Sequence, residues 1–171
     1  MRVLQRQHFG FTLIELLITV AIAAIVVGGS IAGFVRFNER QEVQNTAKEV
    51  QQLMRTAQSK ARVRDAPDAA VDGPCFKLTS YQVERTANAF TLKPNCELES
   101  GAASLGTEVG NVAIPTGMTV NPAAGLTTDF TTLENGVVFS DGSTSKVFSF
   151  AKNGYTYSFT VSANGNISNV E

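Results

Sequence analysis

The chain has 171 residues, 43% of them hydrophobic, and a formal net charge of −1. This length suits one domain plus an anchoring segment. The charge is uneven, because residues 36–64 hold seven basic and three acidic side chains (+4), whereas residues 65–171 hold five basic and eleven acidic ones (−6). The acidic C-terminal part disfavours a nucleic-acid-binding head, although a local basic patch would escape this argument. Segments of opposite sign suit packing between neighbouring copies.

The N-terminal segment changes from polar to apolar at Gly10. Before this glycine the residues are mostly polar, and after it an almost unbroken apolar run extends from Phe11 to Val35, with Glu15 as its single charge. A run of this length can span a membrane. A carboxylate inside it costs up to about 2.5–3.5 kcal/mol at the bilayer centre. Glu15 is therefore a candidate functional residue.

Residues 10–15, Gly-Phe-Thr-Leu-Ile-Glu, resemble the class III signal of type IV pilins and type II secretion pseudopilins. The resemblance implies that a prepilin peptidase cuts after Gly10 and methylates the new amine of Phe11. It also implies that Glu15 pairs with the Phe11 amine of an adjoining subunit. The other partners that it implies are further pilin subunits, a membrane platform protein and an assembly ATPase. The subunit would cross the cytoplasmic membrane once before assembly, and then belong to an extracytoplasmic or cell-surface filament.

Two other interpretations of the N-terminal segment stay open. A secretory signal needs a short apolar core and a small-x-small cleavage site, which Ala21-Ile22-Ala23 offers, although Glu15 would interrupt that core. A plain anchor would carry an extracytoplasmic binding module that does not polymerise. Within the resembling family, a major pilin, a secretion pseudopilin and a minor or DNA-uptake pilin compete. The C-terminal Val-x-x-x-Gly-x-Ile pattern resembles H-type minor pseudopilins.

Beyond Arg36 the apolar pattern narrows to one helical stripe. Its members recur at steps of three or four residues, which predicts a helix with one side packed on a sheet: Val43, Ala47, Val50, Leu53 or Met54, Ala57 and Ala61. Residues 11–64 together predict one helix of about 80 Å at 1.5 Å per residue. Glycines 28, 29 and 33 predict a bend or a locally unwound stretch, because glycine disfavours helix.

A β-rich head is expected after a loop at residues 65–74. Cys75 and Cys96 flank two expected strands, residues 76–83 and 89–93. In an exported protein this even count predicts a disulfide closing a loop of about twenty residues; two unpaired buried thiols are the alternative. One further short strand is expected at residues 112–114 or 118–120.

The C-terminal end predicts an antiparallel meander covered by the helical stripe. The expected strands are residues 136–140, 146–150, 155–161 and 166–170, with Asn153-Gly154 and Asn164-Gly165 as type I′ turns. Helix on sheet is a complete core, so the expected fold class is α+β, an architecture that the pilin family shares. The expected parts are a leader (1–10), a membrane or filament-core half-helix that protrudes (11–35), an amphipathic half-helix (36–64) and the head (65–171).

Residues for catalysis or cofactor binding are not apparent. Once His8 leaves with the leader, no nucleophile–base pair, phosphate loop or metal-ligand cluster stands out, so the protein is not expected to be an enzyme and no cofactor is expected. Asp129, Glu134 and Asp141 offer a calcium site as one alternative and exposed loop acids as the favoured one. Asn166-Ile167-Ser168 matches a glycosylation sequon within an expected strand.

Overall fold

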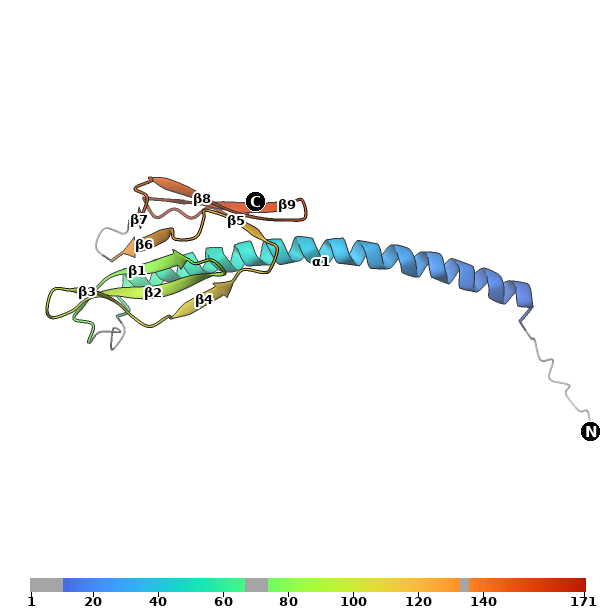
Figure 1. Cartoon of the computed structure of the whole chain (residues 1–171), viewed down its shortest axis with the longest axis horizontal. Helices are drawn as coiled ribbons and strands as arrows, with labels where there is room; N and C mark the ends of the chain where they lie inside the picture. Colours follow the sequence, from blue (N-terminus) through green and yellow to red (C-terminus); the bar gives the residue numbers. More distant parts are fainter. Residues whose placement is uncertain (1–10, 67–73, 133–135) are drawn as a thin grey trace, which may run out of the picture. The chain divides into compact units, whose positions relative to one another are not determined.

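The computed structural model describes residues 11–66, 74–132 and 136–171. Within these ranges, helix α1 (Leu13–Val63) precedes nine strands. The strands are β1 (Lys77–Arg85), β2 (Ala89–Glu97), β3 (Ala103–Leu105), β4 (Gly110–Ala113), β5 (Thr119–Asn121), β6 (Thr127–Thr131), β7 (Val137–Phe139), β8 (Ser145–Lys152) and β9 (Tyr155–Ser162). The chain divides into two compact units, residues 1–38 and 39–171, and α1 contributes to both (Figure 1).

Helix α1 confirms the helix predicted over residues 11–64. The expectation of an unwound stretch at Gly28, Gly29 and Gly33 is wrong, because helical hydrogen bonding continues through all three. A glycine costs about 1 kcal/mol relative to alanine in a helix, yet it still donates its backbone N–H. Unwinding would lose several consecutive hydrogen bonds, and with no proline in α1 no donor is missing.

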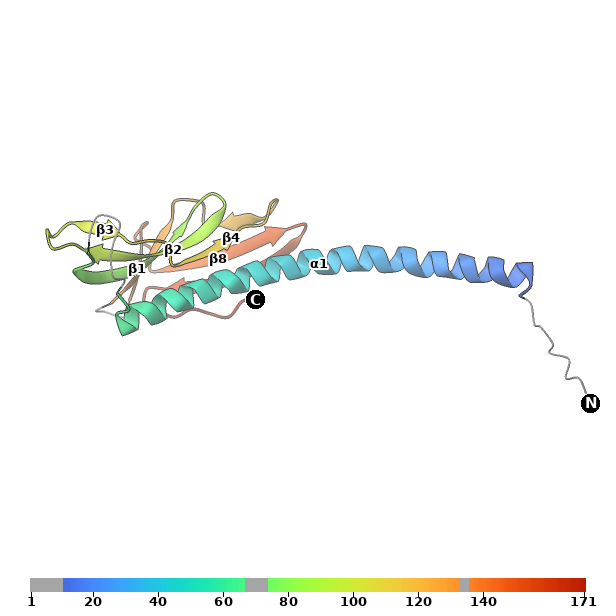
Figure 2. The same cartoon turned by 90° about the horizontal axis from the view of Figure 1, so that it is seen from below.

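The part of α1 from residue 39 onward packs against two antiparallel sheets (Figure 2). Every residue of the predicted apolar stripe is buried there: Val43, Ala47, Val50, Leu53, Met54, Ala57 and Ala61. The same core contains four phenylalanines whose ring centroids lie 5.3–6.2 Å apart: Phe90, Phe148, Phe150 and Phe159. The α+β prediction, a long N-terminal helix on antiparallel sheet, is therefore confirmed.

The strands form two sheets where one meander had been expected. The larger sheet has the order β3-β2-β1-β6-β7, with β4 also pairing with β2, and the smaller has the order β5-β8-β9. Strand β7 was expected beside β8, but it pairs with β6 through Phe130 and Val137. The turn after β7, where Gly142 has a φ of 73°, carries the chain to the other sheet.

The two Asn-Gly turns have different outcomes. Asn153 and Gly154 have φ angles of 51° and 85°, as a type I′ turn requires, and they join β8 to β9 as predicted. The second prediction is wrong, because Gly165 has a φ of 82° but Asn164 does not have a positive one. Instead the Gly165 N–H donates to the Ser162 carbonyl at 2.9 Å and closes a turn over residues 162–165.

The C-terminal segment, residues 166–171, is not the strand that was expected. It makes a single bridge, between Val161 and Ile167, and lies along the outer edge of β9. Ser168 N–H donates to the Thr160 carbonyl at 2.9 Å, and Ser158 and Glu171 exchange two backbone hydrogen bonds. The segment is held from the helix side by α1, because the Gln58 side chain donates to the Gly165 carbonyl at 2.6 Å and Gln51 donates to that of Ser168.

The middle of the head holds more strand than predicted. One short strand was expected at either of two positions, and the structure has a strand at both, β4 and β5. Strands β3 and β6 were not predicted. Strands β1 and β2 extend beyond their expected ends. The predicted disulfide between Cys75 and Cys96 is confirmed, with the two Cα atoms 5.3 Å apart. It closes the open end of the β1–β2 hairpin, next to the Phe76 N–H, which donates to the Glu97 carbonyl.

Candidate functional site

The first turn of α1 is built by a cap that was not predicted from the sequence. The Thr12 carbonyl accepts the first helical hydrogen bond, from Leu16 N–H at 3.2 Å. The Thr12 hydroxyl accepts a second one, from the Glu15 N–H at 3.3 Å. Thr12 is thus the N-cap residue and Glu15 the third helical residue, the Thr-x-x-Glu arrangement of a capping box. That spacing was the available signal for Thr12.

This cap places the Glu15 carboxylate where the helix itself favours a negative charge. Unpaired backbone N–H groups give the N-terminus of a helix a partial positive charge. Glu15 lies in that first turn. A new α-amine on Phe11 would add a full positive charge at the same end. The first turn can therefore hold a carboxylate in an otherwise apolar segment.

Around Glu15 the helix is apolar and uncovered. All residues from 11 to 28 are exposed, including Phe11, Leu13 and Ile14 at 81%, 83% and 68%. A continuous apolar surface of this kind marks a contact with a membrane or another protein. Within the described residues, α1 is the one helix long and apolar enough to cross a membrane, by length and composition.

The predicted site residues fall in different places. Gly10, the expected cleavage position, and His8 lie outside the described residues. Phe11 and Glu15 lie together at the start of α1, and their pairing between subunits stays a prediction. Cys75 and Cys96 form the disulfide at the far end of the β1–β2 hairpin.

The three acids that offered a calcium site are not brought together. Asp129 lies in β6, where the Gln82 amide donates to its carboxylate at 3.1 Å and the Ser80 hydroxyl at 3.3 Å. Burial raises the pKa of Asp129, although the two hydrogen bonds lower it. Because Asp129 is half-buried in a strand, the expectation of an exposed loop acid is wrong for this residue. Glu134 lies outside the described residues. Among the described residues, no group of three or more His, Cys, Asp or Glu side chains is placed to hold a metal.

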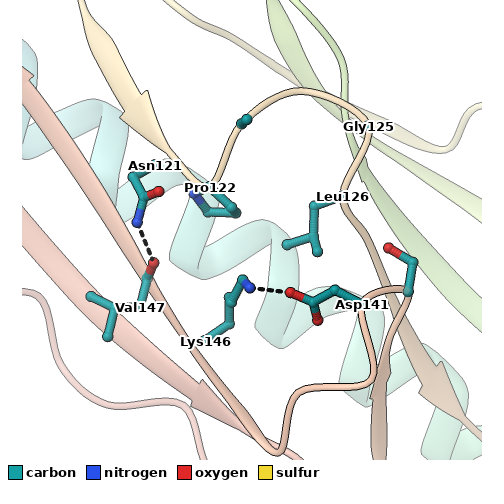
Figure 3. A pocket seen from close by; sticks show the side chains of 9 residues that line it. Asn121, Pro122, Gly125, Leu126, Asp141, Lys146 and Val147 are labelled. Carbon is teal, nitrogen blue, oxygen red and sulfur yellow. Dashed lines mark hydrogen bonds and ion pairs between the residues drawn. The ribbon is translucent and has the colours of Figure 1, made fainter.

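Asp141 lies in a shallow pocket of about 500 Å³ between the loop after β5 and the start of β8 (Figure 3). The polar groups that line this pocket bind each other. Asp141 pairs with Lys146, which with Ser143 lowers the pKa of its carboxyl to about 2, and the Asn121 amide donates to the Val147 carbonyl at 3.5 Å. These partners leave the pocket without a free titratable group for acid–base chemistry.

Arg85 is a buried cation that no ion pair among the described residues neutralises. Arg85 is 7% exposed, and its Nε and Nη1 atoms lack hydrogen-bond partners. The guanidinium carbon lies 5.5 Å from the centroid of the Phe90 ring, a cation–π arrangement that partly compensates lost hydration. Burial lowers the pKa of Arg85.

Comparison with known proteins identifies the N-terminal segment. Residues 5–31 match the family model described as the prokaryotic N-terminal methylation motif. No curated protein and no solved structure matches the chain. The match confirms that the N-terminal segment is a class III prepilin signal. Together with this signal, the long helix on antiparallel sheets gives the chain a pilin-like architecture.

The prepilin signal has direct consequences for how the protein is processed. A class III signal implies processing by a prepilin peptidase and assembly with other pilin subunits. Combined with the apolar first half of α1, it fits anchoring in a membrane before assembly. Signal and fold together indicate a structural protein.

Proposed function

We propose that the protein is a structural subunit of a type IV pilus-like filament, polymerised through its N-terminal helix. The observation that carries this proposal is the capped first turn, where Glu15 is the only charge on an exposed apolar helix within the methylation motif. Filament assembly would cover this helix with copies of itself. A subunit that stayed a monomeric anchor would have no use for a carboxylate there.

The proposed sequence of events starts in the cytoplasmic membrane. The peptidase removes residues 1–10 and methylates the Phe11 amine. Residues 11–35 leave the lipid for the filament core, residues 36–64 carry the head, and residues 65–171 complete it. A platform protein and an assembly ATPase drive this extraction, and the product is an extracytoplasmic or cell-surface filament.

Glu15 acts in this proposal by pairing with the Phe11 amine of an adjoining subunit. Removing one partner of a buried ion pair costs about 3–5 kcal/mol, mostly because the other charge is left unpaired. Even the lower value changes a docking equilibrium by roughly a hundredfold. Subunits docked in a wrong register leave both charges unpaired, so the same pair would also select the register.

The test compares filaments sheared from cells that express wild type, Glu15→Val or Thr19→Val at equal subunit levels. Thr19 is the matched control, because it is exposed one turn further along and its hydroxyl bonds only the Leu16 carbonyl. Glu15→Val keeps the backbone N–H that donates to Thr12, so the cap survives. We expect Glu15→Val to lose filaments at least tenfold and Thr19→Val to keep them.

The same strains also distinguish the filament subunit from a plain anchor. In the presence of the peptidase, the intact mass should correspond to a chain that begins at Phe11 with one added methyl group. An uncleaved chain would support the non-polymerising anchor. Equal filament yield from wild type and Glu15→Val would refute the pairing of Glu15 with the amine.

A further inference from the structure

The exposed side of α1 carries a basic stripe, defined as Lys48, Arg55 and Arg62. The three residues are seven positions apart, about two helical turns, so they share one face and span about 21 Å. All three are exposed. The buried stripe that includes Val50 and Met54 lies on a different face of the helix, so the basic stripe is not part of the core.

The basic stripe has no carboxylate partner within the described part of the chain. The ion pairs there involve other residues. Arg55 makes one neutral contact, from Nη2 to the Asn169 side-chain oxygen at 3.3 Å. Glu39 and Glu42, by contrast, are engaged with Asn153 and Lys152 of the smaller sheet. Three positive charges therefore remain available on this face.

An acidic edge is defined here as Glu99 and Glu108, which lie in the loops that join β2 to β3 and β3 to β4. Glu99 is in the turn after β2. Glu108 is in the loop that returns beside β2, where the Val109 N–H donates to the Leu92 carbonyl at 2.9 Å. Both are exposed, and neither takes part in the ion pairs of the described residues.

The two surfaces are opposite in charge, three cations on one and two carboxylates on the other. Within the described residues the two surfaces form no ion pair with each other. Each surface can therefore meet its counterpart on another copy.

We propose that the basic stripe of one subunit binds the acidic edge of a neighbouring subunit. This inference rests on the proposed function and names a contact between heads, separate from the Glu15 contact. Such a contact is head-to-tail, because each copy offers a different surface at each side. Repetition of a head-to-tail contact produces an open helical polymer where its rotation does not close into a ring. Nucleic acid is the weaker occupant, since the acidic edge and the net charge of the head would repel it.

The test uses the full chain in cells with the assembly machinery and reverses each surface separately. The stripe variant is Lys48→Glu/Arg55→Glu/Arg62→Glu, and the edge variant is Glu99→Lys/Glu108→Lys. Each alone should reduce sheared filaments about tenfold or more, because like charges then face each other. Glu49→Lys/Glu171→Lys is the matched control: it changes the charge as much as the edge variant does, at exposed acids elsewhere, and should leave the yield unchanged.

Mixing the variants gives the decisive result. Co-expressed stripe and edge variants should restore filaments, because the reversed stripe of one copy meets the reversed edge of the other, and a folding defect would not be rescued in this way. Normal yield from both single variants, or no recovery in the mixture, would overturn the proposal. Loss of duplex-DNA retention by the stripe variant with unchanged filaments would overturn it in favour of nucleic acid.

These outcomes separate the inference from the proposed function. Wild-type filaments that depend on Glu15 but ignore both charge reversals would refute only the contact between heads. A wild-type subunit that is neither cleaved nor polymerised would refute both.

Discussion

Removal of the Cys75–Cys96 disulfide should lower the free energy of unfolding of residues 39–171 by about 3 kcal/mol. The two cysteines are 21 positions apart, and a cross-link around a loop of that length restricts the unfolded chain by roughly 3 kcal/mol. The native contacts at this end of the hairpin do not depend on the bond. The Phe76–Glu97 backbone hydrogen bond and the pairing of Lys77 with Glu97 would both remain.

The choice of replacement matters because the two sulfurs differ in burial. Cys96 is fully buried, whereas Cys75 is half-buried. Cys75→Ser/Cys96→Ala therefore removes the bond without placing a hydroxyl in the core. Cys75→Ser/Cys96→Ser should lose a further 1–3 kcal/mol or so, because a buried hydroxyl without a partner pays its full desolvation cost.

Chemical unfolding of the detergent-solubilised protein, with and without reductant, measures both losses in the free energy of unfolding. In thermal unfolding, a loss of 3 kcal/mol for a unit of this size corresponds to a fall of roughly 10 °C in Tm. Reductant should bring wild type close to the Ser/Ala variant and leave that variant unchanged. If the variant and wild type agreed within about 0.5 kcal/mol in the absence of reductant, loop closure would not be the source of stability and the reasoning would be wrong.

Two further substitutions test the packing of the head. Asp129→Asn should stabilise the protein at pH 7 and not at pH 3, as measured by urea unfolding. Burial raises the pKa of Asp129, so above a pH of about 3.9 the folded state binds more protons than the unfolded state. The free energy of unfolding of the wild type therefore falls as the pH rises from about 3.9 through the raised pKa. Equal pH dependence in both proteins would contradict this. Gly110→Ala should destabilise by about 1–3 kcal/mol, because its Cβ would lie 2.8 Å from Leu53 Cδ1. In the double variant Gly110→Ala/Leu53→Val, the Leu53 Cδ1 atom is absent, so the double variant should lose less stability than the sum of the two single variants. If the two losses were strictly additive, the clash would not be the cause.

The sequence was most informative where one local pattern decides the outcome. The three- and four-residue recurrence of Val43, Val50 and Ala57 has one sterically sensible solution, a helix with one buried side, and the structure has it. Asn153-Gly154 likewise needs only its own backbone preferences and two flanking strands. The class III signal lies in a few adjacent residues, so it too could be read directly.

Prediction failed where contacts between distant residues decide. Nothing local to Val137–Phe139 indicates that β7 joins β6 and not β8, since both are strands with an apolar face. Only the tertiary structure shows that β5 and β9 occupy both edges of β8. Asn164-Gly165 carries the same dipeptide as the correct turn, but its position is set by bonds from Gln51 and Gln58, more than a hundred residues earlier. The cap by Thr12 was local, and its spacing to Glu15 could have been recognised.

Among the described residues, each edge of the two sheets is either a short strand or covered by another segment. Strands β3, β4, β5 and β7 are only three or four residues long, and short edge strands resist pairing with another chain. The long outer edge of β9 is covered by residues 166–171. Few backbone N–H and C=O groups at these edges are therefore available to pair with a strand of another chain.

These short or covered edges have a consequence for the proposed filament, in which copies of the protein would lie close together. Fibres that share a backbone ladder between chains gain the extreme persistence of amyloid. Copies that can join only through side chains keep separate folds. The proposed polymer would therefore come apart into folded subunits and not into chains that share a sheet.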